Sequence, residues 1–169
     1  MNYSRLLAVF GLVFFAVMSR LLPHPPNFTA INAVAVFSAF TLGHFGFSCG
    51  VVYGAMLISD LIFGLHSQLL FVYFSLGLIL FISRFRMNPA VSLLLSPLIF
   101  FFVTNFGVWL IDGFYPQTLN GLGLCYLAAL PFLANELIGS FFYGFVLFSG
   151  FALFEKYIPS IQKEPLESI

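Results

Sequence analysis

The chain has 169 residues, of which 61% are apolar and only 7% are charged, and its mean hydropathy is +1.06. There are too few polar residues to cover an apolar core, so the composition excludes a soluble globular protein and predicts an integral membrane protein. Six Lys and Arg balance six Asp and Glu. This balance excludes electrostatic binding of nucleic acid as a main function, because that binding needs a clustered positive field.

Six apolar segments follow one another along the chain, and Gly, Pro, His or Arg residues separate them. A spanning helix needs about 20 apolar residues, or fewer with interfacial flanks. The expected helices cover residues 4–22, 29–43, 46–64, 67–84, 89–111 and 134–155. The sequence therefore predicts an all-α, polytopic protein with a single six-helix membrane domain over residues 1–155 and a polar cytoplasmic tail over 156–169.

Two stretches need separate interpretation. The first apolar run follows Arg5 as a signal peptide would, but residues 16–20 offer no small-x-small cleavage site, so we expect a helix of the mature protein. The linker 112–133 contains "TLNGLGLCYLAALPF", which is apolar but too short to span a bilayer and holds Pro131 near its end. We expect this stretch to form a short interfacial or re-entrant helix before the sixth span.

The basic residues predict the orientation. If the N-terminus is cytoplasmic, Arg20 lies outside and the other basic residues lie inside, namely Arg5, Arg84, Arg86, Lys156 and Lys163. This bias agrees with the positive-inside rule and places both termini in the cytoplasm. Residues 20–32 and the linker 112–133 then lie on the extracytoplasmic side.

The rare polar residues gather, by this topology, in the outer third of the membrane. A carboxylate within a span costs about 2.5–3.5 kcal/mol on insertion scales, so Asp60 and Glu136 should face other helices or a wet cavity. We expect an outward-facing ligand pocket formed by Arg20, His24, Asn27, Asn32, Asp60, Asn105, Trp109, Tyr126, Asn135 and Glu136. Helix capping, aromatic anchoring at the interface, and an ion pair of Arg20 with Asp60 or Glu136 are the structural alternatives.

The segment "RLLPHPPNFTAIN", residues 20–32, is the most polar break between two apolar runs. Its three prolines favour a stiff, extended path. We expect it to form a polar strap over the mouth of the pocket.

Gly46, Gly50 and Gly54 lie four residues apart, which is typical of a helix face that packs closely within the fold or against a partner subunit. Motifs for enzymatic chemistry are missing from the sequence: it contains neither HExxH nor a phosphate-binding loop, and its histidines and cysteines lack the spacing of a metal site. The sequence therefore predicts no enzyme, no metal and no cofactor.

Three stretches carry a resemblance: "LLPHPPNFTAINAVAVFSA" at 21–39, "TNFGVWL" at 104–110 and "YPQTLNGLGLCYLAALPFLANELIGSFFYGFVLF" at 115–148. They resemble a family of small, largely uncharacterised bacterial six-helix membrane proteins, which is similar in turn to the substrate-binding S components of energy-coupling factor transporters. The resemblance implies a subunit of the bacterial cytoplasmic membrane that binds a vitamin-like solute. It also implies partners, a membrane coupling subunit and ATPase subunits.

Three functions are compatible with the sequence. The leading hypothesis is a solute-binding membrane subunit with an extracytoplasmic pocket, whose acidic excess favours neutral or amine-bearing solutes. The second is a structural or assembly protein without a ligand, held in a complex through the glycine face. The third is a proton-coupled secondary carrier that acts as a dimer, with Asp60 or Glu136 as the proton relay.

Overall fold

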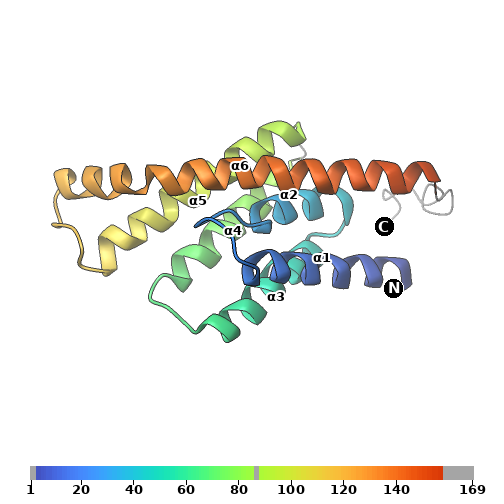
Figure 1. The fold of residues 1–169 in the computed structure, drawn as a ribbon, viewed down its shortest axis with the longest axis horizontal. Coiled ribbons are helices and arrows are strands. Elements are labelled where there is room, and N and C mark those ends of the chain that lie inside the picture. Colours follow the sequence, from blue (N-terminus) through green and yellow to red (C-terminus); the bar gives the residue numbers. More distant parts are fainter. Residues whose placement is uncertain (1–2, 86–87, 158–169) are drawn as a thin grey trace.

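A computed structural model of the protein describes residues 3–85 and 88–157, which form six helices. The helices are α1 (Tyr3–Leu21), α2 (Ile31–Thr41), α3 (Phe45–Phe63), α4 (Leu69–Ser83), α5 (Pro89–Ile111) and α6 (Leu119–Tyr157). The predicted all-α fold is confirmed. The long α6 runs along one side of the molecule, and its last turn lies at the same end as the first turn of α1 (Figure 1).

Local sequence signals place most helix ends where the sequence predicts them. The side chains of His44 and Asn88 accept hydrogen bonds from backbone N–H groups in the first turns of α3 and α5, and Pro89 begins α5 at a position where no N–H is needed. Gly64 ends α3 at φ 98°, a conformation that suits glycine. The predicted breaks between these segments are therefore confirmed.

The expected separate helix before the sixth span is wrong. α6 is a single helix of 39 residues that continues through Pro131, so only residues 112–118 join it to α5. Proline removes one helical N–H, but apolar membrane helices tolerate this loss, and α5 likewise continues through Pro97. The apolar run on both sides of Pro131 outweighs its helix-breaking tendency.

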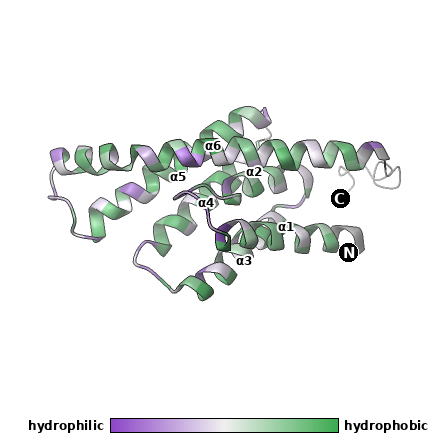
Figure 2. Cartoon of the chain, in the orientation of Figure 1, coloured by the Kyte–Doolittle hydropathy of each residue, from purple (hydrophilic) through white to green (hydrophobic). Residues whose placement is uncertain are grey.

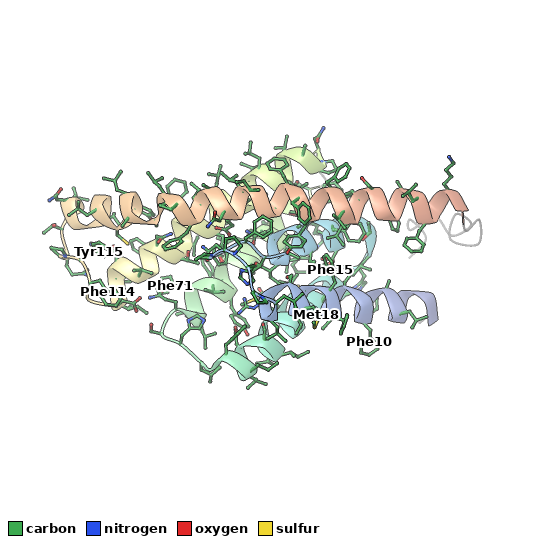
Figure 3. The ribbon with its side chains drawn as sticks, viewed as in Figure 1. Phe10, Phe15, Met18, Phe71, Phe114 and Tyr115 are labelled. Atoms are coloured by element: carbon green, nitrogen blue, oxygen red, sulfur yellow. The ribbon has the colours of Figure 1, made fainter. Side chains whose placement is uncertain are left out.

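The helices are apolar on their outer faces as well as inside. Large side chains such as Phe10 and Phe145 are 63% and 73% exposed, and Phe10 points away from the other helices (Figure 3). Most of the ribbon is hydrophobic, and the hydrophilic residues lie in the connecting loops, at helix ends, on α5 and near the middle of α6 (Figure 2). Such a surface fits lipid rather than water, which indicates a membrane-associated protein.

Three helical segments are long and apolar enough to cross a membrane: Phe45–Phe63, Pro89–Ile111 and Leu119–Phe154. The other apolar helical segments are shorter, at Leu7–Leu21, Ile31–Thr41 and Leu69–Ser83. Length and composition therefore support three spans, and the six full spans expected from the sequence are not established.

The short helix α2 lies at the centre of the fold. Every residue from Ile31 to Ser38 is buried, and α2 packs against all the other helices. Its first eight residues are thereby covered by protein. This arrangement explains how a helix of 11 residues fits an apolar molecule, and it places Asn32 deep inside.

Candidate functional site

A cavity of about 460 Å³ lies beneath the segment that joins α1 to α2. We call residues Leu22–Ala30 the strap and this space the strap cavity. Four of the predicted ligand-binding residues line it, namely Arg20, His24, Asn27 and Glu136. The remaining lining residues are Leu21, Leu22, Pro23, Thr29, Ile31, Phe63 and Phe100.

The strap is not fully extended, contrary to the sequence prediction. The N–H of Phe28 donates to the carbonyl of Pro25 at 3.0 Å, which closes a turn, and Asn27 has φ 63°. A proline followed by a residue with positive φ is what a type II turn requires, and Asn tolerates that conformation. The path is stiff as predicted from the prolines, but it folds back on itself.

The turn of the strap and its C-terminal end are fixed to helices. Asn135 Nδ2 on α6 donates to the carbonyl of Pro26 at 3.0 Å, and the N–H of Ala30 donates to Ser19 Oγ on α1 at 3.1 Å. Phe28 packs against the rings of Phe142 and Tyr143 on α6. Asn135 therefore holds the strap in place, but it does not itself line the cavity.

Arg20 and Asp60 form an ion pair between α1 and α3. Arg20 Nη2 lies 2.6 Å from Asp60 Oδ1, and Tyr73 on α4 donates its hydroxyl to Asp60 Oδ2 at 3.0 Å. Asp60 is 1% exposed, and both of its oxygens are occupied. Of the two ion pairs that the sequence left open, the structure forms the one with Asp60, which links three helices.

Glu136 on α6 and Asn32 on α2 form the second buried polar pair. Asn32 Nδ2 donates to Glu136 Oε1 at 2.6 Å, and the two residues are 2% and 6% exposed. Asn32 Oδ1 and Glu136 Oε2 are also buried, and neither has a hydrogen-bond partner among the residues that the structure describes. Glu136 lines the cavity and Asn32 does not, so one of these two open acceptors belongs to a lining residue and the other to its hydrogen-bonded neighbour.

Three predicted site residues lie elsewhere. Asn105 donates to the carbonyl of Phe101 in its own helix, Trp109 to that of Pro116, and Tyr126 to that of Phe102. The bonds of Trp109 and Tyr126 tie α5 to the turn and to α6. The sequence prediction grouped these residues with Asp60 because they were expected at a similar depth in the membrane. They lie instead on the α5–α6 hairpin and do not line the strap cavity.

The predicted glycine face does not pack within the described part of the chain. A Cβ added to Gly50 or Gly54 would meet no atom within 4 Å, and one added to Gly46 would meet only the His44 side chain. α3 instead packs through a neighbouring row of buried small residues, Ser48, Ala55 and Ser59. Of the two roles that the sequence left open for these glycines, close packing is not found among the residues that the structure describes.

A family model matches residues 1–161, and its description is a family of unknown function, DUF6580. The chain belongs to the DUF6580 family. No curated protein matches it, and no solved structure matches it either. The expected likeness to transporter S components has no support in these comparisons and stays a prediction for this DUF6580 protein.

Several residues that shape the site in this DUF6580 protein were not predicted from the sequence. Tyr73 donates a hydrogen bond to the second oxygen of Asp60. Phe63 and Phe100 form apolar walls of the strap cavity. The depth argument contained a signal for Tyr73, because it lies near the outer end of its expected helix, as Asp60 does. Phe63 and Phe100 carried no such signal among 25 phenylalanines.

The site offers binding groups rather than a metal centre. Within residues 3–85 and 88–157, no group of three or more His, Cys, Asp or Glu side chains is placed to hold a metal ion. The strap cavity combines apolar walls with a few convergent polar groups, which is the usual make-up of a small-molecule site.

Proposed function

We propose that this DUF6580 protein is a membrane subunit that binds a small polar solute in the strap cavity. The observation that carries the proposal is Glu136, which lines the cavity together with strap residues and whose buried Oε2 has no partner among the described residues. Its neighbour Asn32 has a second such acceptor, Oδ1. A buried acceptor without a partner costs about 1–3 kcal/mol. A bound solute that donates hydrogen bonds removes this cost.

The wider role in this proposal is uptake across the bacterial cytoplasmic membrane. Six helices cross the bilayer, both termini lie in the cytoplasm, and the strap cavity opens to the outside. Separate coupling and ATPase subunits supply the energy, as they do for S components. The chain itself acts as a binding subunit and not as an enzyme.

The test is to fill the cavity with a bulky side chain and to measure how much small molecule stays bound to the purified protein. Thr29 lines the cavity, so Thr29→Trp places an indole in it, whereas Leu119→Trp adds the same ring at a position that is 87% exposed. Small molecules that co-purify in mild detergent are quantified by mass spectrometry. We expect at least a tenfold loss of the bound solute in Thr29→Trp and none in Leu119→Trp. Equal retention in both variants would show that the strap cavity is not the binding site.

One observation favours a second function, assembly of a membrane complex without a ligand. Gly50 and Gly54 have open space around them within the described residues, so any close helix contact that they make is with another chain. This alternative predicts that no small molecule co-purifies with the wild-type protein, and the same mass spectrometry measurement decides between the two.

A further inference from the structure

We infer that the solute carries a protonated amine, which binds to Glu136 and Asn32. This inference rests on the proposed function and specifies the chemical class of the solute. It follows from the charges around the strap cavity and from the kind of hydrogen-bonding group that is left without a partner.

The positive charge at the cavity is already neutralised. Arg20 lines the cavity, but its guanidinium donates to Asp60 Oδ1 at 2.6 Å and contacts the sulfur of Met56 at 2.8 Å. Asp60 is fully buried and bound to this one cation. The Arg20–Asp60 pair therefore adds no net charge to the cavity, although Arg20 Nε is left without a hydrogen-bond partner among the described residues.

The negative charge of Glu136 has no such counterion. Among the described residues its one hydrogen-bond partner is the neutral amide of Asn32, and no Lys, Arg or His nitrogen there lies within 4 Å of its carboxylate. His24 does not bond to the Glu136 carboxylate, because its Nδ1 and Nε2 lie against the carbonyls of Pro25 and Arg20. The cavity thus carries one uncompensated carboxylate.

Glu136 is buried, and burial disfavours the charged form of a carboxyl group. The hydrogen bond from Asn32 offsets this cost only in part. A buried anion still needs a cation close by, because the energy of attraction between opposite charges is large away from water.

The open hydrogen-bonding groups at the Glu136–Asn32 pair are acceptors, and Arg20 Nε is a separate buried donor without a partner among the described residues. Glu136 Oε2 and Asn32 Oδ1 can both accept, and an ammonium group supplies three donors and one positive charge. The walls formed by Ile31, Phe63 and Phe100 fit an apolar body behind that group. The geometry is therefore complementary to an amine on an apolar or aromatic frame.

The test compares amines with neutral molecules of the same shape. Purified protein in mild detergent is titrated with benzylamine and benzyl alcohol, tyramine and tyrosol, and tryptamine and tryptophol, with benzoate as the anionic probe. Binding is followed by calorimetry in the wild type, in Glu136→Gln and in Asp112→Asn. Asp112 serves as the control because it accepts a hydrogen bond from Ser67 outside the cavity.

We expect at least one amine to bind tenfold more tightly than its matched alcohol, and benzoate not to bind. Glu136→Gln should abolish this preference while alcohol binding persists, and Asp112→Asn should leave both unchanged. Equal binding of amines and alcohols by the wild type, or a preference that survives Glu136→Gln, overturns the amine inference while the cavity stays a binding site. Failure of every probe to bind contradicts the inference and the proposed function together.

Discussion

Asp60 on α3 is bonded to both α1 and α4, through Arg20 and Tyr73. Removing one partner of a buried ion pair costs about 3–5 kcal/mol, because the other charge is left unpaired. We predict that Asp60→Ala lowers the free energy of unfolding by about 3 kcal/mol, the low end of this range, since Arg20 is 18% exposed. Tyr73→Phe removes one hydrogen bond to a charged group and should cost about 1.5–3 kcal/mol.

Denaturant unfolding in detergent, followed by circular dichroism, measures both effects. The double variant Arg20→Met with Asp60→Leu replaces the pair by apolar side chains and should recover much of the loss, because no unpaired charge is left. If Asp60→Ala unfolds like the wild type, the ion pair does not stabilise the fold. If the double variant is as unstable as Asp60→Ala, the unpaired charge of Arg20 is not the cause.

The sequence identified the charged side chains that matter for the fold, but it did not identify their partners. The scarcity of charge marked Arg20, Asp60 and Glu136, and all three prove to be buried or half-buried. The choice of Asp60 over Glu136 as the partner of Arg20 depends on α1 packing beside α3. Packing of helices distant in sequence cannot be inferred from depth alone, since residues at one depth can lie on opposite sides of a bundle.

Among the helices, the start of α6 depends on a glycine that permits a close approach. A Cβ on Gly121 would meet the carbonyl oxygen of Pro116, which belongs to the backbone of the preceding turn, whereas a Cβ on Gly123 would meet nothing within 4 Å in the described structure. We predict that Gly121→Ala destabilises the protein by about 1–3 kcal/mol through overpacking. Gly123→Ala should be neutral or stabilising by up to about 1 kcal/mol, because alanine is the better helix former.

The matched pair separates the close contact from a general effect of alanine in this helix. Thermal unfolding of the two variants under one detergent condition is the measurement. Equal midpoints for Gly121→Ala and Gly123→Ala would contradict the close approach of Pro116 to α6.

Helix boundaries were predictable where the signal is local, and less so where it competes with another. The cap of Asn88 and the positive φ of Gly64 act within a few residues, so the sequence located both ends. At Pro131 a local breaker competes with an apolar run that extends far to each side, and the run prevails. In the strap a local signal prevails instead. The prolines predicted an extended path, but the positive φ of Asn27 turns the chain within that proline-rich stretch.

Helix length sets the relation of the whole molecule to the bilayer. At about 1.5 Å of rise per residue, the 11 residues of α2 reach about 16 Å and the 39 residues of α6 about 58 Å, against an apolar bilayer core of about 30 Å. α2 is too short to span alone, yet it is enclosed by other helices. α6 is longer than a span needs, so it must tilt or extend beyond the bilayer core.

The number of spans can be decided at α4, whose 15 residues reach about 22 Å. Leu65 and Phe85 flank this helix, are 70% and 69% exposed, and lie in loops, as does Phe114, which is 78% exposed. Single cysteines at these positions, in a chain with Cys49 and Cys125 replaced by alanine, are treated in intact cells with a membrane-impermeant maleimide.

If all six helices span, the cysteines at 65 and 114 are labelled and the one at 85 reacts only after permeabilisation. If only α3, α5 and α6 span, the cysteines at 65 and 85 share a side and the one at 114 lies on the other. Labelling of 65 together with 85 would therefore exclude the six-span topology, and with it the placement of the strap opposite both termini.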